Sequence, residues 1–119
     1  MKLPQTKIRP ISLKDGDSIG IVSTARKISK TELKPALELF KSWGLKVVLG
    51  KHLFGNHNQF SGTIEERSSD MQKMFDNKSI KAIVCARGGY GTIRMVDFLN
   101  FTQFIQQPKW LIGYSDITV

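Results

Sequence analysis

The chain has 119 residues, 40% of them hydrophobic and 24% charged, which fits one globular domain with a buried core. Its net charge of +8 comes with lysines scattered along the sequence and not in blocks, which favours a solvated surface over a nucleic-acid interface. The first twenty residues hold no apolar stretch for a signal peptide or a membrane span, and the single cysteine, Cys85, excludes an intrachain disulfide and a cysteine cluster for zinc. These features give no sign of export, of a membrane partner or of cysteine-bound zinc, and we expect Cys85 to be a small buried hydrophobe.

The first two elements in chain order are a strand and a helix. Residues 18–23 form a short, nearly continuous apolar run, as in a strand covered on both faces. A capping box at residues 29–32 opens the helix and Gly44 ends it. Because Pro35 lacks an N–H and is tolerated only in the first helical turn, we expect the helix to begin closer to Lys34 than the capping box indicates.

The rest of the chain continues this alternation. Residues 46–49 predict a second strand, and the long polar loop 50–62 after it is expected to pack near the mouth of a site. The further predicted elements are a helix opened by a capping box at 63–66 and ending near 77, a strand at 80–85, a helix at 90–99 and a strand at 110–113. Alternating strands and helices imply an α/β fold of three layers, α/β/α, with a mainly parallel sheet, similar to the flavodoxin-like and class I glutamine amidotransferase-like arrangements.

Several polar residues receive structural roles. His52 and His57 lie in the polar loop and are expected to pack or face solvent, so neither is the expected catalytic base. Glu65, Glu66 and Arg67 open a helix, where the acids suit the helix dipole and the arginine is expected to pair nearby.

The turn Arg87-Gly88-Gly89-Tyr90-Gly91 follows a predicted buried strand at its carboxyl end, where open α/β sheets place ligand sites. Its glycines permit close backbone approach, and the following helix supplies free N–H groups for an anion or an oxyanion. It matches neither common phosphate-binding motif, so a plain tight turn remains the alternative.

The second turn, residues 113–118, places Ser115 directly after an apolar strand and before an expected helix. A nucleophile elbow needs a small residue two positions before the serine, and Gly113 supplies it. The N–H of Asp116 would then point at the oxyanion. Ile117 stands where such elbows commonly have a second glycine, and a helix N-cap is the alternative role for Ser115.

Taken together and in order, these motifs give the chain a resemblance to a known family over nearly its whole length. The segments that carry it are 13–19, 60–63 with Glu66, Arg67 and Asp70, the R-G-G-Y-G of 87–91 with Arg94, and 108–118 with G-Y-S-D-I-T. The chain resembles the LD-carboxypeptidases. It departs from the family at Thr24, where proline is common.

The resemblance implies a cytoplasmic serine peptidase with no metal and no other cofactor. Its Ser-His-Glu triad would remove D-alanine from a murein tetrapeptide. It implies Ser115 as nucleophile, the N–H groups of Asp116, Gly88 and Gly89 as oxyanion donors, and substrate contacts from Arg87 and Tyr90. Residues 1–119 would be a truncated N-terminal, nucleophile-bearing domain. The glutamate and the histidine would lie in an absent C-terminal domain, and the full-length protein would be a homodimer.

Two other functions stay open. A related branch of the family hydrolyses peptidyl nucleotide antibiotics and gives immunity. A non-catalytic α/β module would instead hold an anion or a nucleotide at Gly88-Gly89-Tyr90-Gly91 and use Ser115 only as a helix cap.

Overall fold

The computed structural model describes residues 9–25, 27–55, 62–86 and 92–113. Its elements in chain order are β1 (Ser18–Val22), α1 (Lys30–Ser42), β2 (Lys46–Leu49), α2 (Ile64–Asp76), β3 (Ile80–Cys85), α3 (Thr92–Val96), α4 (Thr102–Gln106) and β4 (Trp110–Ile112). The alternation of strands and helices expected from the sequence is therefore confirmed. No helix in the described part of the chain is long and apolar enough to cross a membrane.

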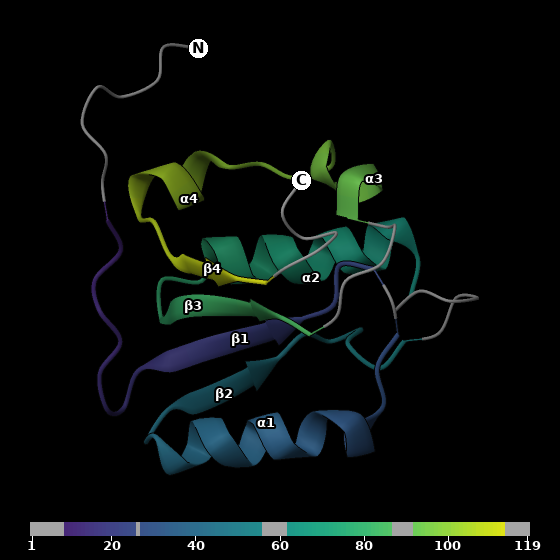
Figure 1. The fold of residues 1–119 in the computed structure, drawn as a ribbon. Helices are drawn as coiled ribbons and strands as arrows, with labels where there is room; N and C mark the ends of the chain where they lie inside the picture. The colour runs from purple at the N-terminus through teal and green to yellow at the C-terminus, as the bar shows by residue number, and fades with distance from the viewer. Residues whose placement is uncertain (1–8, 26, 56–61, 87–91, 114–119) are drawn as a thin grey trace.

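The four strands form one sheet in the order β2-β1-β3-β4, and every neighbouring pair is parallel. Helix α1 covers one face, and α2, α3 and α4 cover the other (Figure 1). The predicted three-layer α/β/α fold with a mainly parallel sheet is thus confirmed. Because the strands are parallel, all their carboxyl ends lie along the same edge of the sheet.

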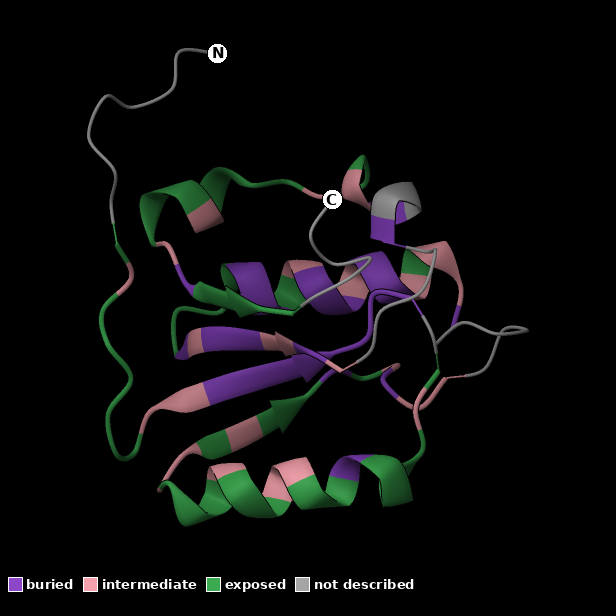
Figure 2. Ribbon diagram, in the orientation of Figure 1, coloured by how far each residue is buried: buried purple, intermediate pink, exposed green. Residues whose placement is uncertain are grey.

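Apolar side chains fill both spaces between the sheet and its helices. On the α2 side the core contains Met71, Met74 and Phe75 of the helix packed against Val22 and Ile83 of the strands. On the α1 side a smaller cluster is formed by Ile21, Leu33 and Leu53. Figure 2 shows the consequence, with burial concentrated in β1, β3 and α2 while most of α1 is exposed. Cys85, which is 8% exposed, is a core residue, as the sequence predicted, and the methionines of α2 are core residues too.

Two glycines are required by the fold, one for its backbone conformation and one for close packing. Gly44 has a φ of 77° one residue after the C-cap of α1, a conformation that ends helices and that side chains with a Cβ rarely adopt. Gly20 in β1 lies under α2, and a Cβ there would stand 2.4 Å from the Met74 sulfur. Helix α2 can therefore lie close to the central strand.

The expected start of the first helix was wrong. Helix α1 begins at Lys30, directly after the N-cap Ser29, and Pro35 lies inside it. The capping box forms in full, with the Ser29 hydroxyl accepting from Glu32 N–H at 3.1 Å and the Glu32 carboxylate accepting from Ser29 N–H at 3.1 Å. Pro35 removes only the bond to the carbonyl of Thr31, which lies on the exposed side of the helix, so the cap outweighs the proline.

The segment between β3 and β4 also differs from expectation. The helix predicted at 90–99 is limited to Thr92–Val96 in the described residues, and a second short helix, α4, had not been predicted. The N-cap residue of α4, Phe101, makes no side-chain cap bond, although the Asn100 side chain accepts from the Thr102 N–H at 2.9 Å. Phe104 of α4 packs on Phe75 of α2 with ring centroids 4.8 Å apart. Packing on α2 therefore contributes to this short helix beside the local bond.

Candidate active site at the carboxyl edge of the sheet

The residues predicted to do the chemistry follow two adjacent strands. The structure pairs Val22 of β1 with Cys85 of β3, and Val84 of β3 with Ile112 of β4. Residues 23–25, Ala86 and Gly113 therefore leave the sheet side by side at its carboxyl edge. The predicted site residues themselves, Arg87, Gly88, Gly89, Tyr90, Ser115 and Asp116, lie outside the described residues, so their predicted roles stay predictions.

The segment after β1, residues 23–25, is buried at this edge of the sheet. Ser23, Thr24 and Ala25 are at most 3% exposed. The Thr24 hydroxyl lies 2.6 Å from the hydroxyl of Thr92, the first residue of α3, and one of the two donates to the other. Buried hydroxyls need such partners because water does not reach them. Thr92 directly follows the predicted glycine-rich turn, so this bond joins the first residue of α3 to the segment after β1.

Arg67 of α2 contacts the same buried segment. Its side chain is 2% exposed, with Nε donating to the Thr24 carbonyl at 3.0 Å and a terminal nitrogen donating to the Gly62 carbonyl at 2.8 Å. The expectation that Arg67 pairs nearby is met by Gly62, five residues earlier, while Thr24 is 43 residues away in sequence. A buried guanidinium needs several acceptors, and backbone carbonyls provide them here.

Helix α2 also holds the first part of the loop after β2. The Asp70 carboxylate accepts a hydrogen bond from the His52 N–H at 2.8 Å, and the His52 Nδ1 lies 3.1 Å from a Glu66 carboxylate oxygen. Glu66 closes the capping box with Thr63 at the start of α2. The structure therefore places His52 in a packing role, as expected, while His57 lies outside the described residues.

Asp70 is an almost fully buried carboxylate. It is 3% exposed, and its second oxygen, Oδ1, has no hydrogen-bond partner among the described residues. Burial raises the pKa of its carboxyl above the ordinary value of 3.8, and the hydrogen bond from His52 N–H and the charges of His52 and Lys73 oppose the rise only in part. It borders a cavity of about 260 Å³ between β2 and α2, which Lys51 and Lys73 also line.

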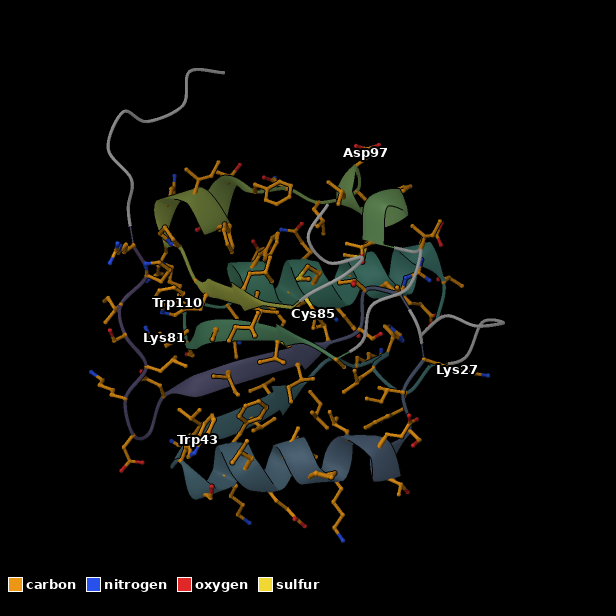
Figure 3. The ribbon with its side chains drawn as sticks, viewed as in Figure 1. Lys27, Trp43, Lys81, Cys85, Asp97 and Trp110 are labelled. Atoms are coloured by element: carbon orange, nitrogen blue, oxygen red, sulfur yellow. The ribbon has the colours of Figure 1, made fainter. Side chains whose placement is uncertain are left out.

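Neither a thiol nucleophile nor a metal centre is formed by the described residues. Burial raises the pKa of the Cys85 thiol to about 12, so it stays neutral at physiological pH; Figure 3 shows the residue at the end of β3. The described residues contain no group of three or more His, Cys, Asp or Glu side chains that would hold a metal ion.

Sequence reasoning did not find the buried bonds at this edge. Thr24 drew attention only as a departure from a family pattern, and Thr92 drew none. Their one signal is position, since Thr24 follows β1 and Thr92 follows the glycine-rich turn, so both belong to segments at the carboxyl edge.

Comparison with known proteins identifies the family. The model of the LD-carboxypeptidase N-terminal domain matches residues 19–119. Among curated proteins, the chain is 37% identical over 110 residues to a probable murein peptide carboxypeptidase of Bacillus subtilis, covering 92% of this chain and 34% of that protein. It is 31% identical over 102 residues to the murein tetrapeptide carboxypeptidase of Pseudomonas aeruginosa, covering 85% of this chain and 33% of that protein.

A solved structure is similar as well. The microcin C7 self-immunity protein MccF, known from Escherichia coli and solved in complex with aspartyl sulfamoyl adenosine, superposes with a TM-score of 0.83 at 31% identity. The superposition covers 92% of this chain and 33% of that chain. The chain thus spans about a third of the length of the proteins it matches.

Proposed function

The chain belongs to the LD-carboxypeptidase family, and we propose that it is the N-terminal, nucleophile-bearing part of a serine peptidase that releases D-alanine from a murein tetrapeptide. The observation that carries the proposal is the pairing of β3 with β4 at the carboxyl edge of the sheet. Adjacent parallel strands lie about 4.8 Å apart, so a turn leaving β3 and a serine leaving β4 start as neighbours. The two relatives named for murein peptides support the substrate class.

In this proposal Ser115 is the nucleophile. Its Oγ attacks the carbonyl carbon before the terminal D-alanine, and its proton passes to a histidine base. The N–H groups of Asp116, Gly88 and Gly89 hold the developing oxyanion, while Arg87 and Tyr90 contact the substrate. The tetrahedral intermediate expels D-alanine as its nitrogen takes up the proton, and water then hydrolyses the acyl-serine ester.

The base comes from outside this chain. His52 is engaged with Glu66 at 3.1 Å, on the loop after the edge strand β2 and not after β3 or β4, which argues against it as the partner of Ser115. We place the histidine and the glutamate of the triad in a C-terminal domain, which agrees with relatives about three times as long as the chain. The complete protein would be cytoplasmic and dimeric.

A second substrate class has its own support. MccF, which the chain resembles at a TM-score of 0.83, was solved with aspartyl sulfamoyl adenosine, an aminoacyl nucleotide analogue. The same nucleophile and oxyanion donors would then serve an immunity hydrolase for peptidyl nucleotides.

Release of D-alanine from a murein tetrapeptide tests the proposal on the complete protein, its Ser115→Ala variant and the 119-residue chain. We expect Ser115→Ala and the chain alone to release none on a laboratory timescale, because loss of a triad member leaves only about 10³- to 10⁴-fold catalysis over water. His52→Ala and His57→Ala are matched controls expected to stay within about a few-fold of wild type, against about 10⁴-fold for a triad member.

Three outcomes would decide against parts of this assignment. Wild-type activity in Ser115→Ala removes Ser115 from the chemistry and leaves the helix-cap role of a non-catalytic binding module. Activity of the chain alone near that of the complete protein means that a base lies within these residues. Faster hydrolysis of a peptidyl nucleotide than of the tetrapeptide would favour the immunity reaction.

A further inference from the structure

A chain of buried hydrogen bonds connects three segments at the carboxyl edge of the sheet. Arg67 on α2 donates to the carbonyls of Gly62 and Thr24, and the Thr24 hydroxyl bonds to that of Thr92. Arg67, Thr24 and Thr92 are 2%, 1% and 6% exposed. Thr24 is the centre of this network, since its backbone contacts the arginine and its side chain contacts the second threonine.

The two residues that flank the predicted glycine-rich turn are bonded to the same short segment. Ala86, the residue before the turn, donates its N–H to the Val22 carbonyl at 2.8 Å. Thr92, the residue after the turn, is bonded to Thr24 at 2.6 Å. Ala86 and Thr92 are therefore bonded to residues that lie two positions apart in the chain, Val22 and Thr24, and Arg67 donates to the second of these.

We propose that Arg67, Thr24 and Thr92 are positioning residues that fix the glycine-rich turn, and with it the N–H groups of Gly88 and Gly89, for the oxyanion. This inference rests on the proposed function, in which those N–H groups stabilise the tetrahedral intermediate. Oxyanion donors act only within about 3 Å of the reacting oxygen, and a misplacement of about 1 Å can cost about 100-fold in rate.

The geometry explains why an arginine suits this position. The guanidinium is a planar fork whose Nε and terminal nitrogens donate in different directions, here to carbonyls of two separate segments. A lysine ammonium is a single point of charge on a flexible stem and does not hold both carbonyls in one fixed arrangement. The arginine thus ties the end of the 50–62 loop to the segment after β1 while its charge remains in a buried environment.

Substitutions in the complete protein test the role of the network. Thr24→Val and Thr92→Val keep the shape of the side chain but remove the hydroxyl, and we expect each to lower kcat by about tenfold or more with KM within about threefold. The double variant should lose no more than either single variant, because both substitutions break the same bond. Thr24→Ser keeps the hydroxyl and should restore the wild-type kcat.

Ser68→Ala is the matched control. Ser68 is the next residue after Arg67 on α2 and is 6% exposed, and its hydroxyl has no hydrogen-bond partner among the described residues. Its removal changes a buried side chain without breaking the network, so activity should match that of wild type. Values of kcat for Thr24→Val and Thr92→Val within twofold of the Ser68→Ala value, or losses that add in the double variant, would refute the positioning role.

Amide hydrogen exchange supplies a readout that does not depend on catalysis. We expect the amides of residues 86–92 to exchange about tenfold faster in Thr24→Val and in Arg67→Lys than in Ser68→Ala, because opening of the turn no longer has to break the same anchors. Unchanged exchange contradicts the inference. If Ser115→Ala proves fully active, the proposed function fails while faster exchange still supports the anchoring of the turn.

Discussion

Lys109 offers the sharpest test of how buried polar groups stabilise this fold. The residue precedes β4, is 4% exposed, and donates from its ammonium to the carbonyl of Ile80 at 2.6 Å and to that of Asn77. Asn77 is the C-cap of α2 and Ile80 begins β3. One side chain thus connects the α2–β3 turn to the edge strand, and Lys109→Met removes both hydrogen bonds while keeping most of the side-chain volume.

The expected cost follows from two opposing effects. Hydrogen bonds to a charged group contribute about 1.5–3 kcal/mol each, so the two bonds together would give about 3–6 kcal/mol. Burial works against the charge and, with repulsion from Lys81, lowers the pKa of Lys109 below its ordinary 10.5, although Asp76 opposes this. Because the methionine escapes that desolvation, we expect a net loss of about 2 kcal/mol in the free energy of unfolding.

The lowered pKa of Lys109 also predicts how the cost of Lys109→Met changes with pH. Between the lowered pKa in the fold and 10.5 the unfolded chain binds more protons at Lys109 than the folded protein does, so stability from this group rises with pH. The cost of Lys109→Met should therefore grow as pH increases through that window. Urea unfolding of the complete protein, followed by circular dichroism from pH 7 to 10.5, measures it. The exposed Lys34→Met is the control, and an equal, pH-independent effect of both substitutions would refute the reasoning.

Three further predictions concern other positions. Pro35→Ala should raise the free energy of unfolding by about 1 kcal/mol, because it restores the bond to the Thr31 carbonyl inside α1, and a decrease in urea unfolding would contradict this. Asp70→Asn keeps an acceptor for His52 N–H but cannot ionise. Because the pKa of Asp70 is raised in the fold, the stability of wild type should decline as pH rises from 3.8 through the folded pKa. Thermal melting of the variant as a function of pH should lack that decline. Cys85 should resist iodoacetamide at pH 8 until urea unfolds the protein, because its thiol pKa is about 12; rapid labelling of the native state would show that it is accessible.

Features that depend on neighbouring residues were predicted from the sequence. Both capping boxes form, at Ser29 with Glu32 and at Thr63 with Glu66, because each joins groups only three residues apart. Gly44 ends α1 with a positive φ, as its lack of a Cβ allows. The apolar runs of the strands and their alternation with helices were enough to predict the parallel sheet, since each buried face needs a covering helix.

Two kinds of feature were decided by the tertiary structure: those where local signals oppose each other, and those that depend on partners distant in the sequence. Pro35 alone argued for a later helix start, but the cap and the packing of Leu33 against the sheet hold the first turn. The N-cap residue of helix α4 makes no side-chain cap bond, and the helix packs on Phe75 of α2. The same applies at the candidate site, where Thr24 bonds to residues 43 and 68 positions away. Local sequence predicts which residues form turns, helix caps and strands. The hydrogen-bond partner of a buried polar group is determined only by the tertiary structure, when the sheet brings the carboxyl ends of its strands together.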